Sequence, residues 1–402
     1  MSIRILEGEC VQVMKTLPDC SVDAVVTDPP YGIRFMGQAW DGADIEHRYM
    51  TRSAKPDARR RNGMAAAAGQ YDLSPAAMLA FQEFSETWAR QALRVLKPGG
   101  HLLSFSSPRT YHRMACGIEQ AGFELFDQIM WVFGSGFPKS HNGEWGGTAL
   151  KPAHEPIAVA RKPREGTIAS NWRAHGTGAL NIDRCRVFPE SVAEVQAQQQ
   201  HGAEYSAGRW PANLLHDGSD EVLAAFPRAS GQRANLSATA PSEKTSNCYS
   251  RMRRDGEASA VSENEGVVGF KMKAGARRLD AGSAARFFYC AKADRADRNE
   301  GLGDPGPQFK KGSTMRDAEN VGRARKGNFH PTVKPTDLMR YLCRLVTPAG
   351  GVILDPFMGS GSTLKAAELE GFSAVGIEID PDYVQIARQR IAADAPLFAE
   401  VA

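Results

Sequence analysis

The segment VVTDPPYG (residues 25–32) places a carboxylate, two prolines and a phenol ring directly after strand-forming residues. The preceding SVDAVV predicts a short buried β-strand, so Asp28 is expected just past the carboxyl end of that strand, where open α/β sheets bind their ligands. Pro29 and Pro30 fix φ at about −65° and remove two backbone donors, so the turn is stiff and presents carbonyl oxygens. Tyr31 adds a flat ring beside the carboxylate. These residues predict a turn that accepts hydrogen bonds from a ligand; taken alone, they also leave open an ordinary Asp-Pro turn.

A second group of functional residue types lies in VILDPFMGSGSTLKAA (residues 352–367), which predicts a strand, a glycine turn and a helix. Gly359 and Gly361 let the backbone approach a ligand closely, and the helix that follows points its first amides at the same place. Glu378 follows Asp355 by 23 residues, at the end of the next predicted strand. An acid at that offset suits the hydroxyl groups of a ribose. The order of these parts predicts a site for a nucleoside-containing cofactor.

Two phosphate-binding patterns are missing from the sequence. It has no G-x-x-x-x-G-K-[ST], and the glycine turn lacks the third glycine of the dinucleotide pattern. A cofactor with a nucleoside and no pyrophosphate therefore fits best, and S-adenosylmethionine is the candidate.

The elements that must position these motifs alternate along both ends of the chain. In residues 1–165, predicted strands at 101–107, 124–134 and 155–162 are interleaved with predicted helices at 74–100 and 109–123. Residues 285–402 return to the same rhythm, with predicted helices at 336–351, 361–371 and 381–393 around strands at 352–357 and 373–380. This alternation predicts an α/β fold with a Rossmann-like, doubly wound, mostly parallel sheet.

Residues 166–284 interrupt that rhythm. They are rich in Gly, Ser, Ala, Gln, Asn and Arg and contain only short apolar runs, which predicts a loop-rich insertion. Residues 161–330 carry 27 Lys and Arg against 20 Asp and Glu, and a further basic cluster lies at residues 52–61. Basic segments of this kind suit a polyanion such as nucleic acid, although solvated loops also carry them.

The bulk composition is that of an ordinary globular protein, with 42% hydrophobic and 24% charged residues. No apolar stretch approaches the length of a membrane-spanning helix, and MSIRILEGEC lacks the apolar core of a signal peptide. The seven cysteines are scattered without a C-x-x-C, so we expect reduced thiols, no metal site and a cytoplasmic location.

The two motifs together are similar to those of S-adenosylmethionine-dependent amino-group DNA methyltransferases. DPPYG followed by DPFMGSGST resembles the β-class order, and HPTVKP (330–335) matches the element that precedes the cofactor strand in that class. LKPGG, SGFPKS, GTALKPAHEPI and HGTGALNIDRCRV resemble phage and prophage members. The resemblance implies a prokaryotic or phage protein associated with the nucleoid. Double-stranded DNA is its implied partner, and a cognate restriction endonuclease and a second copy of the chain are further candidates.

By this resemblance, residues Asp28, Pro29, Pro30 and Tyr31 are catalytic. The Asp28 carboxylate and the Pro29 carbonyl would accept the two N–H groups of an exocyclic amine and make its nitrogen nucleophilic. Tyr31 would stack on a base swung out of the duplex. Positioning for in-line attack on a methyl group would then supply most of the catalysis, without a metal or a covalent nucleophile.

The same resemblance implies a set of cofactor-binding residues. The binding loop would supply Asp355, Phe357, Gly359, Gly361 and Thr363, and Glu378 would bind the ribose. Thr332 and Lys334 would lie near the carboxylate of the cofactor. Glu9 stands where the family usually has the Asp of a GDC sequence, so it keeps the charge on a longer arm.

Several activities compete for this resemblance. Methylation at C5 of cytosine would need a Pro-Cys dipeptide, and the sequence has none. The leading Asp favours adenine N6 over cytosine N4, whose enzymes more often begin the motif with Ser. Enzymes that modify rRNA amines or protein glutamines usually begin it with Asn. A catalytically inactive, cofactor-sensing DNA-binding protein is a further alternative, against which the intact DPPY argues. We expect the insertion at residues 166–284 to recognise the DNA sequence.

Overall fold

A computed structural model describes residues 2–32, 73–136, 143–147, 149–188, 208–229, 246–247, 250–251, 282–291, 295–302 and 327–394. The chain divides into two compact units. The first comprises Met1–Cys185, Asn213–Ser219 and Cys290–Ala402, and the second comprises Arg186–Ala212 and Asp220–Tyr289. The predicted boundaries at residues 165 and 284 remain predictions, and the basic cluster at 52–61 lies outside the described residues.

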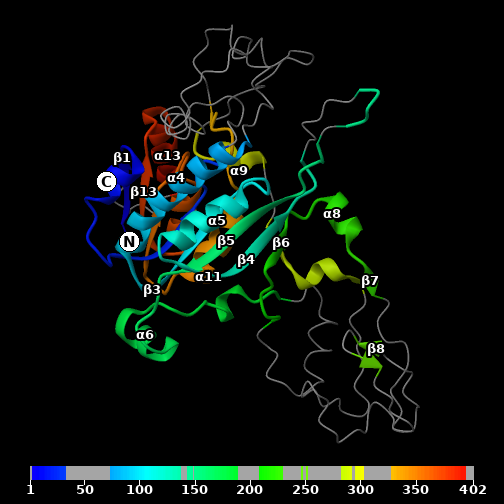
Figure 1. Cartoon of the computed structure of the whole chain (residues 1–402), viewed down its shortest axis with the longest axis horizontal. Helices are drawn as coiled ribbons and strands as arrows, with labels where there is room; N and C mark the ends of the chain where they lie inside the picture. Colours follow the sequence, from blue (N-terminus) through cyan, green and yellow to red (C-terminus); the bar gives the residue numbers. More distant parts are fainter. Residues whose placement is uncertain are drawn as a thin grey trace, which may run out of the picture. The chain divides into compact units, whose positions relative to one another are not determined.

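The first unit holds the motifs singled out above, on strands and helices that alternate for most of its length (Figure 1). In chain order its elements are β1 (Ile3–Glu7), α1 (Cys10–Met14), β2 (Val22–Thr27), α4 (Pro75–Val95), β3 (Leu96–Phe105), α5 (Tyr111–Gln120), β4 (Glu124–Val132), β5 (His154–Arg161), α6 (Ile168–His175), the 3₁₀ turn η3 (Asp183–Cys185), β6 (Leu214–His216), α9 (Arg295–Asn299), α11 (Thr336–Val346), β12 (Val352–Asp355), α12 (Ser362–Leu369), β13 (Ser373–Glu378) and α13 (Pro381–Asp394).

The strands of this unit form a mixed, mostly parallel sheet in the order β1-β13-β12-β2-β3-β5-β4-β6. Neighbours from β1 to β3 are parallel, and so are β4 and β6. β5 runs antiparallel to both β3 and β4. The predicted Rossmann-like, doubly wound fold is confirmed. The antiparallel strand departs from the predicted alternation because no helix is described between β4 and β5, so the chain returns as a hairpin.

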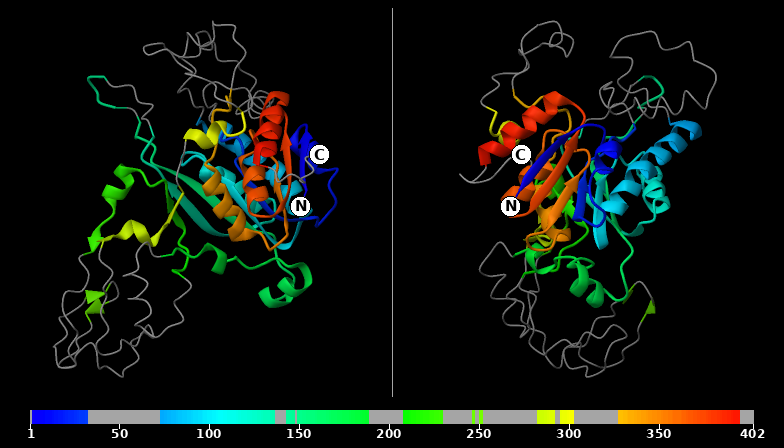
Figure 2. Two further views of the ribbon diagram at one scale, coloured as in Figure 1. Left: turned by 180° about the vertical axis from the view of Figure 1, so that it is seen from behind. Right: turned by 90° about the vertical axis from the view of Figure 1, so that its left-hand side faces the viewer.

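Helices cover both faces of this sheet. The right-hand view of Figure 2 shows α4 and α5 on one side of the strands and the orange to red helices of the C-terminal segment on the other. Helix α4 begins as predicted, because the Ser74 hydroxyl accepts a hydrogen bond from Ala77 N at 3.3 Å and Pro75 occupies the first turn. It ends at Val95, earlier than predicted, since the following Lys-Pro-Gly-Gly belongs to β3.

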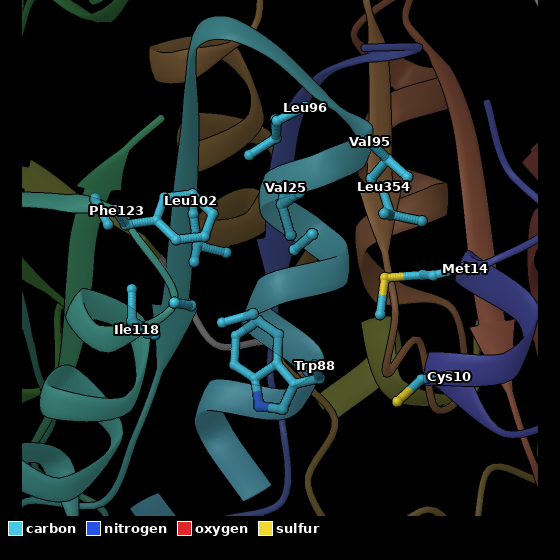
Figure 3. Packing of buried hydrophobic residues seen from close by; sticks show 14 of the residues in the cluster. Cys10, Met14, Val25, Trp88, Val95, Leu96, Leu102, Ile118, Phe123 and Leu354 are labelled. Carbon is cyan, nitrogen blue, oxygen red and sulfur yellow. The ribbon is translucent and has the colours of Figure 1, made fainter. Parts of the chain in front are cut away.

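The core on the α4 side joins the two ends of the chain. Trp88 of α4 packs in one cluster with Met14 of α1, Val25 of β2 and Leu354 of β12, and each of these side chains is at most 1% exposed (Figure 3). Burial of one such apolar side chain stabilises the fold by about 1.5–3 kcal/mol. The strands that end at the two sequence motifs are therefore held side by side by a shared core.

The second unit contains short elements: α8 (Asp220–Ala225), β7 (Arg228–Ala229), β8 (Ser246–Asn247), β9 (Ser250–Arg251), β10 (Gly282–Ser283), the 3₁₀ turn η5 (Ala284–Phe287) and β11 (Tyr289–Cys290), whose last residue belongs to the first unit. β7 pairs antiparallel with β10, and Val187 bridges to Arg209. Within the described ranges of the whole chain, no helix is long and apolar enough to span a membrane.

Candidate active site

The carboxyl ends of four neighbouring parallel strands, β1, β13, β12 and β2, form the edge of a cavity of about 1290 Å³. Asp28 follows β2, Asp355 ends β12 and Glu378 ends β13. With one exception, the predicted site residues line this cavity: Glu9, Asp28, Pro29, Pro30, Tyr31, Thr332, Lys334, Asp355, Phe357, Gly359, Thr363 and Glu378. The two sequence motifs thus meet in one cavity, as open α/β sheets require.

Asp28 lies at the centre of a compact polar cluster. Its Oδ1 accepts a hydrogen bond from the Tyr31 hydroxyl at 2.7 Å, and its Oδ2 is 2.9 Å from Lys334 Nζ. Lys334 Nζ is also 2.9 Å from Glu155 Oε2 and donates to Tyr31 Oη at 3.2 Å. The Tyr31 hydroxyl lies 3.2 Å from the same Glu155 oxygen. A single ammonium group therefore holds two carboxylates and a phenol in place.

Burial and the charges of its neighbours shift the titration of this cluster. Burial raises the pKa of Asp28; Lys334 opposes this effect and Glu155 adds to it. Burial alone would lower the pKa of Lys334, but Asp28 and Glu155 outweigh it and raise that pKa above its ordinary value. Burial and the two carboxylates also raise the pKa of Tyr31, so the phenol keeps its proton. With both carboxylates ionised and Lys334 protonated, the cluster carries one net negative charge.

Asp355 is a buried carboxylate whose partners are uncharged donors. Thr27 Oγ1 donates to Oδ1 at 2.7 Å, Phe357 N donates to Oδ1 at 3.1 Å, and Thr363 Oγ1 donates to Oδ2 at 2.5 Å. Burial raises the pKa of Asp355 to about 6, although these hydrogen bonds act in the opposite direction. Asp355 thus ties β2, the glycine turn and the first turn of α12 together.

Glu378 closes the loop from the next strand. Its Oε2 accepts a hydrogen bond from Gly359 N at 2.9 Å, and its Oε1 accepts from Ile379 N and Asp380 N at 3.0 and 2.8 Å. Burial raises the pKa of Glu378 to about 6 against these bonds. The carboxylate has further lone pairs that can accept from a ligand on the cavity wall.

Aromatic rings form one apolar wall of the cavity. Phe357 lies against Trp88 with ring centroids 5.6 Å apart and against Phe84 at 6.1 Å. Phe84 also lines the cavity. Because Trp88 belongs to the core, this wall is rigid, and its flat apolar surface suits the face of a purine.

Gly359 and Gly361 take different places in the glycine turn. Gly359 has φ +52° and lies on the cavity wall, and a Cβ there would lie 2.7 Å from His330 Nε2. Gly361 has φ +84° and caps α12, and a Cβ there would lie 2.9 Å from Ala387 Cβ of α13. Gly361 is the exception among the predicted site residues, because the structure places it against α13.

Glu9, Thr332 and Lys334 were predicted as cofactor ligands by resemblance. The structure places Glu9 at the N-cap of α1, where its carboxylate accepts from Val11 N at 3.0 Å and Gln12 N at 2.9 Å. Thr332 N lies 3.4 Å from His330 Nδ1. Lys334 contacts the cluster around Asp28. Their part in binding a cofactor remains a prediction.

Glu155 is a member of this polar cluster that the sequence analysis did not single out. It lies on β5, at the start of EPIAVARK, which was predicted only as a strand, and within GTALKPAHEPI, which was named only for the resemblance. It is separated from Tyr31 by 124 residues along the chain. The available signal was an acid at the start of a predicted strand. That this end of the strand faces the site follows from the antiparallel course of β5 in the structure.

The donor and acceptor set fits S-adenosylmethionine. The carboxylate of Glu378 at a strand end can accept a hydrogen bond from a ribose, and the Phe357 wall can pack on a purine. Gly359 has no Cβ, so its backbone on the cavity wall is accessible to a ligand. Among the residues that the structure describes, no group of three His, Cys, Asp or Glu side chains could hold a metal ion.

The sequence matches the DNA methylase family (N6_N4_Mtase) over residues 22–389. The type II methyltransferase M.HindIII of Haemophilus influenzae is 26% identical over 206 residues, which is 44% of this chain and 64% of that protein. The type II methyltransferase M.ScaI of Streptomyces caespitosus is 44% identical over 66 residues, 16% of this chain and 22% of that protein. The chain thus covers less than two thirds of the length of these relatives.

Two solved structures are similar to the chain as a whole. The cytosine-N4-specific PvuII DNA methyltransferase has a TM-score of 0.46 at 15% identity, covering 97% of this chain and 86% of that one. M1.HpyAVI in complex with SAM has a TM-score of 0.39 at 15% identity, covering 97% and 100%. Both likenesses are weak, so the relationship rests on the sequence match.

Proposed function

The chain belongs to the DNA methylase family, and we propose that it is a site-specific DNA methyltransferase. It would move a methyl group from S-adenosylmethionine to the exocyclic amino group of adenine, N6. One observation carries this proposal: the Asp28–Tyr31 turn and the glycine loop with Glu378 line the same cavity. An amine acceptor site and a nucleoside site within one cavity are what direct methyl transfer between two bound molecules requires.

The glycine loop and its neighbours would hold the cofactor. Glu378 would accept from the ribose, Phe357 would pack against the adenine, and the Gly359 backbone would follow the ligand closely. When bound, S-adenosylmethionine supplies a methyl group on a cationic sulfonium, which leaves as a neutral thioether. Asp355 would stabilise this loop, because the hydrogen bonds that it accepts from Thr27 and Thr363 keep the loop attached to β2 and α12.

The Asp28 turn would hold the base. The exocyclic amine is a weak nucleophile because its lone pair is delocalised into the ring. Hydrogen bonds from its two N–H groups to Asp28 and to the Pro29 carbonyl would pull the nitrogen towards a tetrahedral, nucleophilic state. In the structure the Tyr31 hydroxyl occupies Asp28 Oδ1, so the entering amine would take its place there and free the ring to stack on the base.

The leading Asp of the DPPY motif supports adenine as the target, as the sequence resemblance implies. The cytosine-N4 alternative predicts a different product from the same cavity, and the inactive, cofactor-sensing alternative predicts binding without any product. The intact DPPY turn on the cavity wall supports an active enzyme, since a module that only senses the cofactor needs no acceptor for an amine.

The second unit supports DNA as the substrate. Arg186 lies over the Trp210 ring at 5.4 Å from its centroid, and Arg209 and Arg286 lie at 4.1 and 4.3 Å from the centroid of Phe287. Arginines beside aromatic rings can contact phosphates and stack on bases. We propose that this unit and the rest of the predicted recognition region contact the target sequence, alone or with a second copy of the chain or a partner endonuclease.

Methyl transfer to DNA tests the proposal directly. The purified protein is incubated with tritiated S-adenosylmethionine and unmethylated genomic DNA, and the digested nucleosides are separated by mass spectrometry. We expect N6-methyladenine, and methylation-aware sequencing should place it in one short motif. N4-methylcytosine would establish the alternative target, while cofactor binding with no methylated nucleoside on any DNA offered would overturn the enzymatic proposal.

A further inference from the structure

Lys334 lies between two carboxylates, and only one of them belongs to the sequence motif. Its Nζ is equidistant, at 2.9 Å, from Asp28 Oδ2 and Glu155 Oε2. Lys334 is buried, with 7% of its side chain exposed, so water screens these contacts little. The ammonium therefore divides its attraction between Asp28 and Glu155.

We propose that Glu155 is a positioning residue for methyl transfer: by sharing Lys334 with Asp28, it keeps the Asp28 carboxylate basic enough to accept the hydrogen bonds and then the proton of the target amine. This inference rests on the proposed function. Without Glu155, Lys334 would pair with Asp28 alone, and the carboxylate would be a poorer acceptor for the amine.

The charge of the cluster changes in step with the reaction. The amine nitrogen forms the bond to the methyl carbon with its lone pair, while the electron pair of the broken carbon–sulfur bond goes to sulfur. The nitrogen becomes positively charged and gives one N–H proton to Asp28, which releases it to solvent. A cluster with one net negative charge stabilises that developing positive charge, whereas a neutral cluster does not.

Glu155 also acts on Tyr31. Its Oε2 lies 3.2 Å from the Tyr31 hydroxyl, so it offers that hydroxyl a second acceptor besides Asp28. When an amine takes the place of the hydroxyl at Asp28 Oδ1, the hydroxyl can turn to Glu155 without losing its hydrogen bond. This exchange lowers the cost of opening Asp28, since a buried hydroxyl without a partner is unfavourable.

Every charged or titratable group that faces Asp28 belongs in the test of this idea. Tyr31 comes from the same turn, Lys334 from the segment before α11, Glu155 from β5 and Asp355 from β12. His330 lies near Lys334; burial lowers its pKa to about 3, so it stays neutral at working pH. Asp355 and Glu378 in the same cavity have pKa values raised to about 6, so the NMR titration of Asp28 identifies the part of the acid limb that reports on Asp28 under the influence of Lys334 and Glu155.

The experiment measures kcat, the KM for DNA and the pH profile of kcat from about pH 5 to pH 9. Glu155→Gln should lower kcat on the order of tenfold and move the acid limb to lower pH, because the carboxylate that raises the pKa of Asp28 is gone. Lys334→Met should move the same limb to higher pH. Glu155→Asp, which keeps the charge on a shorter arm, should restore most of the wild-type profile.

A matched control is Glu124→Gln, at a half-exposed Glu of β4 that pairs with Arg161 on the same sheet; it should leave kcat and the profile unchanged. Calorimetric S-adenosylmethionine binding and thermal unfolding show that each variant is folded. Carboxyl-carbon NMR titration of Asp28, with Asp28→Asn for assignment, gives the same shift without turnover.

The outcomes separate the two proposals. A wild-type profile in Glu155→Gln, with an unmoved Asp28 titration, overturns the assignment to Glu155 and leaves the proposed function standing. A wild-type protein without methyl transfer overturns the proposed function, and the NMR titration then still tests the electrostatic link. If Glu155→Gln does not fold, Glu155→Ala takes its place, because it removes the same carboxylate without leaving a buried amide: an acid limb at lower pH supports the proposal, and an unmoved limb overturns it.

Discussion

Asp28 and Asp355 stand at the ends of two neighbouring parallel strands, β2 and β12, yet the protein balances their charges by different means. Asp28 meets the Tyr31 hydroxyl and Lys334, a buried cation that a second carboxylate also contacts. Asp355 meets two hydroxyls and a backbone amide that belong to fixed elements. The difference supports our proposal that the first carboxylate exchanges hydrogen-bond partners with a ligand, and it indicates that the second holds the loop in shape.

The largest expected effect is that of removing Asp28, the carboxylate proposed to exchange partners with the ligand. Asp28→Ala should lower methyl transfer by roughly a thousandfold or more, because it removes the main acceptor for the amine and leaves Lys334 with Glu155 only. S-adenosylmethionine affinity should change little, since the glycine loop is untouched. Single-turnover assays and calorimetry measure the two quantities, and near-normal turnover would contradict the mechanism.

A glycine pair sharpens the comparison on the cofactor side. Gly359→Val puts a branched side chain in the left-handed region and against His330 on the cavity wall, so S-adenosylmethionine affinity should fall by about a hundredfold. Gly361→Val meets Ala387 and also puts a branched residue at positive φ, so it should instead lower the free energy of unfolding by roughly 2–4 kcal/mol. Calorimetry and denaturant titration of both variants read these out; equal affinity losses would mean that Gly361 also contacts the ligand.

The pH dependence of stability isolates the shape-holding carboxylate. The pKa of Asp355 is raised to about 6 in the folded protein, so between its unfolded value and 6 the folded state holds a proton that the unfolded state has lost. The protonated Asp355 therefore stabilises the folded state at low pH, and this stabilisation is lost as the pH rises to about 6. Asp355→Asn should reduce the fall in unfolding free energy between about pH 4 and pH 7 by on the order of 2 kcal/mol. The unfolding free energy of each protein is measured by denaturant titration at several pH values. An equal fall of this free energy with pH in the two proteins would contradict a raised pKa.

The smallest expected effect concerns a single hydroxyl. Tyr31→Phe keeps the ring that would stack on the base and removes the bond to Asp28 Oδ1. Turnover should fall about tenfold or less, whereas Tyr31→Ala should fall much further because stacking on a base contributes about 1–3 kcal/mol. Equal losses in the two variants would mean that the ring does not contact the base.

The sequence predicted most of the sheet because its cues are local. SVDAVV, the Ser74-Pro75 start of α4 and the glycine turn before α12 each carry their own pattern within a few residues. The antiparallel course of β5 could not be predicted from such cues, since pairing between strands depends on contacts across the sheet. The Lys-Pro-Gly-Gly segment was predicted to end a helix. In the structure it belongs to β3, whose pairing with β2 has an irregular register at this point.

The candidate site shows the same division. Asp28 and the glycine loop were found because their residue types follow predicted strands, whereas the position of Lys334 depends on contacts across 303 residues of chain. The resemblance assigned Lys334 to the cofactor, and its contacts in the structure are to Asp28, Tyr31 and Glu155. Glu155 had no local pattern that distinguished it from any acid at a strand end. Electrostatic sharing of one cation is a property of the assembled cavity.

The contact between Asp23 of β2 and the start of β12 affects the order in which the chain can fold during synthesis. Its buried carboxylate accepts a hydrogen bond from Val352 N at 2.8 Å, across 329 residues, while Lys97 pairs with the other oxygen at 2.6 Å. Until the ribosome has released β12, β2 has one open edge and half of its backbone partners missing. Such late closure makes folding slow and exposes a strand to aggregation.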